Sequence, residues 1–190
     1  MGVSYAADPT PGRHTIASGL YYNVTKVWQF VPWAPAVRGP YRKKKEYRAS
    51  EEEAMKMKAG AELKQLLDAA GGCLFAMVIG VHHWRIFDYL NRATGWDRTA
   101  DDYMEAGRRI HTLRQLFSLR HGVDPRNNRL HPRPAGDPPL TEGPLAGRTV
   151  PIDGLMALHW EELGWDRESG IPLDETVRAL KIDTVCPEVL

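Results

Sequence analysis

Cysteine is scarce in this sequence, with only Cys73 and Cys186 among 190 residues. Two cysteines so far apart provide neither a disulfide framework nor a complete local zinc site, which favours a reducing, cytoplasmic setting. Long hydrophobic runs are also lacking: the longest, residues 74–81, is far shorter than the roughly 20 residues that a membrane-spanning helix needs. The N-terminus has neither the basic nor the apolar region of a secretory signal. We therefore expect no membrane span and no export.

An excess of charge of one sign is absent as well. The 25 basic residues nearly balance the 24 acidic ones, which leaves a net charge of +1. Such a balance gives no field that would attract nucleic acid or an anionic membrane, so we expect neither partner. The basic run from Arg42 to Lys45 is followed closely by glutamates and is typical of a solvated surface. A patch that docks an acidic ferredoxin or nucleic acid is the alternative for this run.

The sequence does have a globular composition, with 43% hydrophobic and 26% charged residues, and a length that suits one core. Residues 1–48 are interrupted by prolines and rich in aromatic residues, which predicts an irregular segment that packs against other protein. The rest, residues 49–190, is the predicted helical domain, with a proline-rich extended segment over 122–151. Helices are predicted over 51–70, 74–93, 100–119, 153–163 and 173–181. The expected fold class is mainly α with long proline-rich irregular segments.

The sequence also indicates where two helices begin and which face of one is buried. Ser50 with Glu53, and Thr99 with Asp102, have the spacing of capping boxes. Apolar residues recur at helical spacing after Thr99 and predict the buried face of that helix. The predicted stripe consists of Tyr103, Ala106, Ile110, Leu113 and Phe117.

One spacing indicates chemistry. Asp68 stands near the end of the first long helix, Gly71 and Gly72 follow as a turn, and Cys73 opens the next helix. A cysteine at a helix N-terminus has its thiolate favoured by free backbone amides, which suits an iron or zinc ligand. Glycines let the backbone approach a bulky cofactor. From spacing alone, a buried structural cysteine after a helix break is the alternative.

The pattern Asp68-x-x-Gly71-x-Cys73 resembles the second of the two Asp-x-x-Gly-Leu-Cys/Asp loops of the aldehyde ferredoxin oxidoreductase family. Upstream, residues 5–14 (YAADPTPGRH) resemble the family's segment that ends in an active-site histidine. Residues 103–122, 144–148 and 164–172 resemble its C-terminal helix and closing segments. The resemblance covers nearly the whole chain and implies the helical C-terminal region of such an enzyme.

The resemblance implies roles for particular residues. Asp68 would contact a tungsten- or molybdenum-bis-pterin, with Gly71 and Gly72 in the same loop, and Cys73 would be the fourth ligand of a 4Fe-4S cluster. His14 would be the catalytic acid–base group near the metal, where a side chain that titrates near neutral pH is useful. Two departures stand out: Gly72 replaces the family's usual leucine, and no Cys-x-x-Cys-x-x-x-Cys run supplies the other three cluster ligands.

The resemblance implies part of an enzyme that oxidises aldehydes to carboxylic acids and passes electrons through the cluster to ferredoxin. It would be inactive without a missing N-terminal portion or partner chain. A non-catalytic helical interaction module derived from that enzyme is the alternative. A third hypothesis is a standalone metal-binding protein that uses Cys73 and nearby histidines.

Other conspicuous residues favour structural interpretations. The adjacent pair His82-His83 is expected to lie on the surface or in the core of a helix, because neighbouring helix positions point about 100° apart and chelate one ion poorly. Trp160 and Trp165 are expected to pack the closing helices, and Cys186 to be an incidental thiol.

Overall fold

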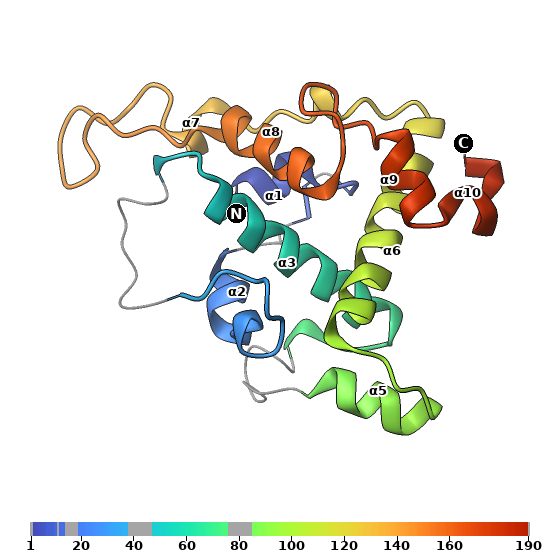
Figure 1. Cartoon of the computed structure of the whole chain (residues 1–190). Coiled ribbons are helices and arrows are strands. Elements are labelled where there is room, and N and C mark those ends of the chain that lie inside the picture. The colour runs from blue at the N-terminus through green and yellow to red at the C-terminus, as the bar shows by residue number, and fades with distance from the viewer. Residues whose placement is uncertain (1, 11, 14–18, 38–46, 76–84, 190) are drawn as a thin grey trace.

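A computed structural model describes residues 2–10, 12–13, 19–37, 47–75 and 85–189 of the chain. Within these ranges the protein is mainly α-helical, as predicted, and its β structure is limited to an isolated antiparallel bridge between Trp165 and Pro172. Figure 1 shows α3 (Glu51–Ala69) running through the middle of the molecule. Helix α3 packs against α6 (Ala100–Arg120) on one side and α8 (Ile152–Leu163) on another.

Helix α3 begins where the sequence predicts. The Ser50 hydroxyl accepts a hydrogen bond from the Glu53 N–H at 3.3 Å. Acidic residues fill the first turn, where the helix dipole favours negative charge. Lys56 pairs with Glu52 at 2.7 Å and with Glu53 at 2.8 Å, which adds side-chain support along the same face. The prediction of a helix over 51–70 is confirmed.

Helix α6 is opened by the predicted capping box. The Thr99 hydroxyl accepts from the Asp102 N–H at 3.2 Å, and the Asp102 carboxylate accepts from the Thr99 N–H at 2.8 Å. These reciprocal bonds satisfy backbone donors that a helix start would otherwise leave unpaired. The predicted helix over 100–119 is therefore confirmed, with one further residue at its end.

The buried face of α6 differs from the predicted apolar stripe. Phe117 is 56% exposed, whereas His111, Thr112 and Gln115 are almost fully buried. Hydrogen bonds explain the difference: the Gln115 amide donates to the Gly170 carbonyl at 2.8 Å, and the Thr112 hydroxyl accepts from a buried indole at 3.3 Å. Polar groups paired in this way avoid most of the cost of burial, so hydrophobicity alone did not identify the face.

The N-terminal segment contains short helical pieces and no long helix, as predicted for its described residues. Helix α1 (Gly2–Ala7) packs against α8, and α2 (Gly19–Thr25) packs against α3. A 3-10 turn, η1 (Val27–Gln29), follows α2. Both helices of this segment therefore contact helices of the C-terminal domain.

Aromatic residues of this segment pack into the same core. The Tyr22 hydroxyl is buried and donates to the Pro35 carbonyl at 2.7 Å. Phe30 lies edge-on against Phe87 of α5 (Ile86–Thr94), with 5.6 Å between ring centroids. The predicted packing of the aromatic segment is confirmed, and its partner includes helices of this chain.

The helix predicted over 74–93 is not continuous. Leu74 and Phe75 begin a helical turn, and residues 76–84 lie outside the described ranges. Arg85 has φ −77° and ψ 54°, which is not helical, and α5 starts after it. Helix α5 ends at Gly95, whose φ of 73° is the left-handed conformation that favours glycine. The prediction is therefore wrong at Arg85 and right for the second half.

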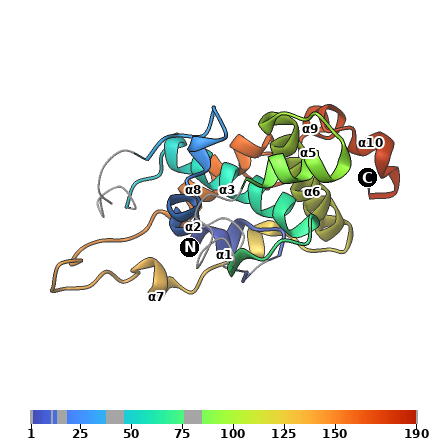
Figure 2. The same cartoon turned by 90° about the horizontal axis from the view of Figure 1, so that it is seen from below.

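The proline-rich segment contains two short helical pieces that the sequence did not predict. These are η3 (Pro125–Asn127) and α7 (Pro132–Ala135), and each begins with proline at its first position. Residues 137–147 are all exposed. Figure 2 shows the stretch after α7 projecting away from the helices. The predicted lack of a long helix here is confirmed.

The C-terminal elements close the fold beside α6. They are α9 (Asp174–Ala179), α10 (Ile182–Val185) and η4 (Pro187–Val189). A small apolar cluster of Leu116, Val177, Leu180 and Ile182 joins them to α6. The predicted helices over 153–163 and 173–181 are thus confirmed to within two residues at each end.

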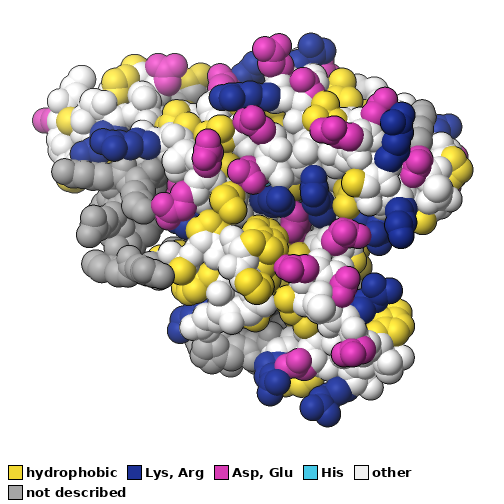
Figure 3. All heavy atoms as spheres, viewed as in Figure 1, with side chains coloured by type: hydrophobic (Ala, Val, Ile, Leu, Met, Phe, Trp, Pro, Cys, Tyr) yellow, Lys and Arg dark blue, Asp and Glu magenta, His cyan; other side chains and the backbone are white. Residues whose placement is uncertain are grey.

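The surface carries charges of both signs. On the face in Figure 3, basic and acidic side chains are interspersed, in agreement with the near balance of charge in the sequence. Of the helices in the described ranges, none has both the length and the apolar character needed to span a bilayer.

Candidate functional site

The loop from Asp68 to Cys73 is the C-terminal turn of α3 and the chain that follows it. The Gly72 N–H donates to the Leu67 carbonyl at 2.8 Å, and the Gly71 N–H donates to the Asp68 carbonyl at 3.1 Å. Gly71 has a φ of 76°, in the left-handed region. These bonds form a Schellman motif, which satisfies carbonyls at the helix end and leads the chain out toward Cys73.

Gly72 stands where the resembled loops usually have leucine, and the structure accounts for a small residue there. A Cβ atom at this position would lie 2.2 Å from Leu67 Cδ1 and 3.1 Å from the Leu67 carbonyl oxygen. Leu67 is 1% exposed and belongs to the apolar cluster shared by α3 and α6. The space beside the loop is therefore filled by a leucine of the helix, and a larger residue at 72 would require Leu67 to move.

Cys73 is a free and exposed cysteine directly before the helical turn that begins at Leu74. A buried structural cysteine is therefore the wrong interpretation of this position. Cys186 is also free, and its Sγ donates to Glu188 Oε1 at 3.1 Å. Each thiol stands alone, so neither is occupied in a disulfide.

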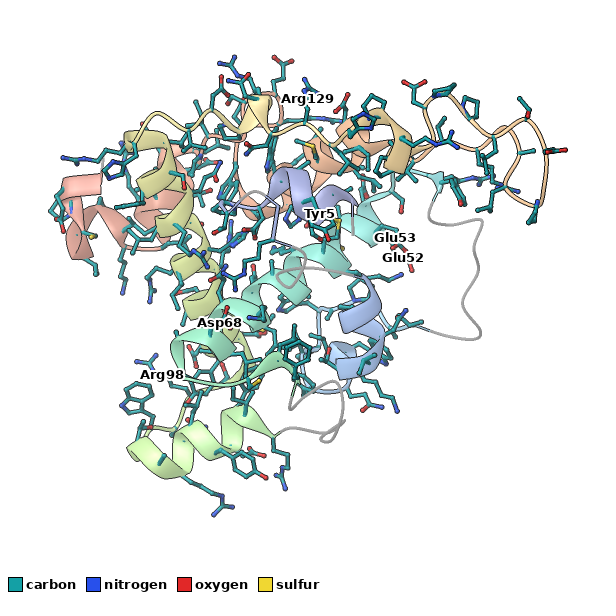
Figure 4. The ribbon with its side chains drawn as sticks, turned by 180° about the vertical axis from the view of Figure 1, so that it is seen from behind. Tyr5, Glu52, Glu53, Asp68, Arg98 and Arg129 are labelled. Atoms are coloured by element: carbon teal, nitrogen blue, oxygen red, sulfur yellow. The ribbon has the colours of Figure 1, made fainter. Side chains whose placement is uncertain are left out.

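Asp68, labelled in Figure 4, lies in the last turn of α3, and two cations hold its carboxylate. Its Oδ2 accepts from Arg13 Nη2 at 2.5 Å, and its Oδ1 is paired with Lys64 Nζ, one helical turn earlier. A carboxylate at a helix C-terminus opposes the helix dipole, and these cations compensate for that within the chain. The Asp68 side chain is still 32% exposed. A carboxylate offers about four acceptor positions, so two remain for other donors.

The predicted catalytic residue His14 lies outside the described residues, and its role stays a prediction. Arg13 directly precedes it in the sequence and makes the ion pair with Asp68, 55 positions away. The Gly12 N–H donates to the Tyr5 carbonyl at 3.0 Å, which closes the turn after α1. The segment that leads to His14 is thus placed against the end of α3, where the predicted cofactor loop begins.

Helix α6 anchors the same segment from the other side. The Arg114 guanidinium donates to Gln65 Oε1 at 2.9 Å and also to the Thr10 hydroxyl. The Ser118 hydroxyl donates to the Pro9 carbonyl at 3.0 Å. Residues on one face of α6 therefore hold the chain between α1 and Arg13 against the helical pair.

A buried carboxylate lies within this set of cations. Asp8 is 3% exposed, and its Oδ1 accepts from the Thr10 N–H at 2.7 Å. Its Oδ2 has no hydrogen-bond partner among the described residues. Burial raises the pKa of Asp8 to about 6, although the nearby charges of Arg114, Arg13 and Lys64 act in the opposite direction. Asp8 thus supplies negative charge that is sensitive to pH near neutrality.

A second group of buried titratable side chains lies where α3, α6 and α8 meet. Burial raises the pKa of Glu62 to about 8, against the charges of Lys58 and Arg108. Burial lowers the pKa of His159 to about 4 and holds that of His111 well below its usual range. Each of the three acids and bases has a side-chain atom without a partner in the described part of the chain. At pH 7 the neutral form of each therefore predominates.

The described residues contain no group of three His, Cys, Asp or Glu side chains placed to hold a metal ion. The pair His82-His83 and the basic run Arg42 to Lys45 lie outside the described residues, so their interpretations stay predictions. Trp160 and Trp165 are 3% and 1% exposed, and Trp165 stacks on His111 with 5.4 Å between ring centroids. The prediction that these tryptophans pack the closing helices is confirmed.

The architecture and the loop together define a helical module that presents one carboxylate and one free thiol at the end of its central helix. The chain belongs to the aldehyde ferredoxin oxidoreductase family, because the family described as "Aldehyde ferredoxin oxidoreductase, domains 2 & 3" matches residues 1–182. The resemblance inferred from the motifs, and the restriction to the C-terminal region, are thereby confirmed.

Similar curated proteins support the same assignment. The tungsten-containing aldehyde ferredoxin oxidoreductase of Pyrococcus furiosus is 36% identical over 115 residues, which is 60% of this chain and 19% of that protein. The protein of the same name from Thermococcus kodakarensis is 32% identical over 143 residues, which is 75% of this chain and 23% of that protein. The match spans about a fifth of the length of these relatives.

Several residues around the loop were not identified as site residues from the sequence. Lys64 could have been, since its spacing of four from Asp68 is that of a helical ion pair. Arg13 and Arg114 could not, because Arg13 meets Asp68 across 55 positions and Arg114 meets Thr10 across 104. Asp8 could not, because its burial and the nearby charges of Lys64 and Arg114 depend on the tertiary structure. Only the tertiary structure brings these charges together.

Proposed function

We propose that this chain supplies one edge of the cofactor site of an aldehyde ferredoxin oxidoreductase-like enzyme, and that it is inactive alone. The proposed reaction is the oxidation of an aldehyde to a carboxylic acid with water as the source of the added oxygen, which releases two protons and two electrons. A 4Fe-4S cluster would carry these electrons to ferredoxin. The observation that carries the proposal is the ion pair between Arg13 and Asp68, because it joins the segment that leads to His14 with the loop that ends in Cys73.

The residues of the loop fit these groups as one part of a larger ligand set. Cys73 is exposed and free, as a ligand to a cluster held mainly by other residues would be. Asp68 keeps acceptor positions for the amino groups of a bis-pterin, and Gly71 and Gly72 leave the loop without side chains that would obstruct it. The described residues lack a metal site of their own, so the other ligands would come from elsewhere in the enzyme.

Each residue of this chain has a limited task in the proposed mechanism. The bound tungsten- or molybdenum-pterin and the cluster would supply the two-electron chemistry. Asp68 would bind and orient the pterin through hydrogen bonds, and Cys73 would hold iron through its thiolate. His14 accepts a proton that the reaction releases, since an imidazole exchanges protons near neutral pH.

The proposed enzyme needs further protein beyond this chain. The parts of the relatives that this chain does not match would provide the first pterin loop and the other cluster ligands, either in the same polypeptide or in a partner chain. We propose that the chain consists of two parts: a segment of residues 1–48 that carries His14, and a helical domain of residues 49–190 that carries the loop. A cytoplasmic setting suits free thiols.

A non-catalytic helical module is the second candidate function. It is favoured by the two cations that compensate for Asp68 within the chain, because the carboxylate then needs no cofactor to stabilise it. The same loop would in that case be a helix end that serves only the fold. The two candidates differ in whether Cys73 ever binds iron.

The test is co-expression of the chain with the N-terminal portion of a family member, followed by iron, tungsten and molybdenum analysis of the purified complex. Cys73→Ala is expected to remove cluster iron while leaving the helical circular dichroism of the lone chain unchanged, since the side chain is exposed. Cys186→Ala is the matched control and should retain the iron. Iron that persists in Cys73→Ala, or a large loss of helix, would refute the ligand role and favour the second candidate.

A further inference from the structure

Three cations and two carboxylates come together where the segment after α1 meets α3 and α6. The cations are Arg13, Lys64 and Arg114, and the carboxylates are Asp8 and Asp68. Of these, the Arg13–Asp68 pair is the link that joins the described end of the N-terminal segment to the loop of α3.

The segment before Arg13 is fixed at three points by distinct bonds. Ser118 of α6 binds the Pro9 carbonyl at 3.0 Å, and Arg114 binds the Thr10 hydroxyl. The Gly12 N–H reaches back to the Tyr5 carbonyl of α1 at 3.0 Å. Beyond these anchors, the side chain of Arg13 carries the last described contact before His14, and that contact is with Asp68.

The Asp68 carboxylate is constrained by the same contact. Lys64 occupies Oδ1 and Arg13 occupies Oδ2, so each oxygen has one partner from a different direction. A carboxylate held at both oxygens has a defined plane, which fixes where its remaining acceptor positions point. Removal of Arg13 would leave Oδ2 without this protein partner and would let the carboxylate turn.

We propose that Arg13 is a positioning residue of the site: its guanidinium orients the Asp68 carboxylate and at the same time ties the chain adjoining His14 to the pterin loop. This inference rests on the proposed function, since it assigns Arg13 a role toward the groups that Asp68 and His14 would serve. The placement of the segment by Arg13 is a property of the chain itself and is measurable without any cofactor.

The first arm of the test measures amide hydrogen exchange of Gly12 by nuclear magnetic resonance in the chain alone. Arg13→Gln is expected to speed exchange at Gly12 by about fivefold, the size expected for loss of a partly exposed ion pair. Asp68→Asn should speed exchange at Gly12 to the same extent, although Asp68 lies on α3 and not in the N-terminal segment. The double variant should exchange no faster than either single one, because both remove one shared interaction.

The matched control for the first arm is Arg129→Gln. It breaks another ion pair, Arg129 to Asp153 at 2.8 Å, which is more exposed than the Arg13–Asp68 pair and involves none of the site residues. Exchange at Gly12 should not change in this variant. Gly12 exchange that is unaffected by Asp68→Asn would overturn the proposal, because the segment would then not depend on the pair.

The second arm uses the loaded complex from the co-expression experiment. Arg13→Gln is expected to lower kcat by about tenfold while leaving iron content unchanged, since groups displaced slightly from their reactive positions lose that much or more. Arg13→Lys, which keeps the charge, should recover part of kcat and of Gly12 protection. An unchanged kcat in Arg13→Gln would overturn the positioning role while the proposed function stands. A wild-type complex that takes up no iron would refute the proposed function, and the exchange arm would still decide whether Arg13 places the segment.

Discussion

Replacing Gly107 with alanine is expected to destabilise the chain by about 3 kcal/mol, toward the upper end of what overpacking a core costs. A Cβ atom at Gly107 would lie 2.0 Å from the Glu62 carbonyl oxygen and 2.7 Å from the Glu62 carbonyl carbon. Both atoms belong to the backbone of α3, so no side-chain rotation relieves the clash. The helices would have to separate, and α3 with α6 is the most extensive helix pair in the described structure.

The expected loss of stability in Gly107→Ala is opposite in sign to the effect of helix propensity, so the two explanations can be distinguished. Alanine favours a helix over glycine by about 1 kcal/mol, so an exposed glycine in a helix would gain stability from the same change. Gly154→Ala in α8 is the matched control, because its nearest contact is the Ala49 methyl at 3.3 Å. Urea unfolding followed by circular dichroism measures both variants. Equal stability of Gly107→Ala and the wild type would show that the close approach of α3 and α6 is not rigid.

The second large effect concerns Glu62 at the same helix crossing. Burial raises its pKa from 4.5 to about 8, so the folded protein holds a proton on Glu62 that the unfolded chain releases at neutral pH. The contribution of this group to the free energy of unfolding is therefore greatest below pH 4.5 and declines as pH rises toward 8. Glu62→Gln removes this dependence, because the amide is neutral in both states. We expect it to stabilise the protein by about 3 kcal/mol at pH 7 and to change stability little at pH 4.

The measurement for Glu62→Gln is the free energy of unfolding of variant and wild type from pH 4 to pH 8. The buried histidines His111 and His159 also titrate, but their depressed pKa values affect variant and wild type alike and cancel in the difference. Glu142→Gln, on the exposed arm after α7, is the control and should give no difference at any pH. A difference that does not grow with pH would show that Glu62 is not held in its neutral form.

These two predictions bear on the candidate site, because the crossing of α3 and α6 sets its geometry. Gly107 fixes how closely the helices approach, and Arg114 lies two turns further along α6, where it reaches Gln65 of α3 and Thr10 of the N-terminal segment. If the helices separated, Arg114 would lose one of these two partners. Variants that loosen the crossing should therefore also disturb the segment that leads to His14.

Local signals in the sequence were sufficient for much of the fold. The helices over 51–70 and 100–119 follow from capping residues and from composition, which act within a few residues and need no tertiary context. The interruption at Arg85 was missed, since neither Arg85 nor its sequence neighbours Trp84 and Ile86 are residue types that break a helix. The buried face of α6 was also missed, because Thr112 and Gln115 are buried through hydrogen bonds to distant residues.

The sequence by itself determined the family, the helical class and the loop of Asp68, Gly71, Gly72 and Cys73, because these are carried by residue types at short, fixed spacings. The tertiary structure alone decided which charges surround that loop. Arg13 meets Asp68 across 55 positions and Arg114 meets Thr10 across 104, and such contacts depend on how closely α3 and α6 pack. At that crossing, Gly107 of α6 packs against the Glu62 carbonyl of α3. This contact depends on both helices, so the sequence of one helix alone does not predict it.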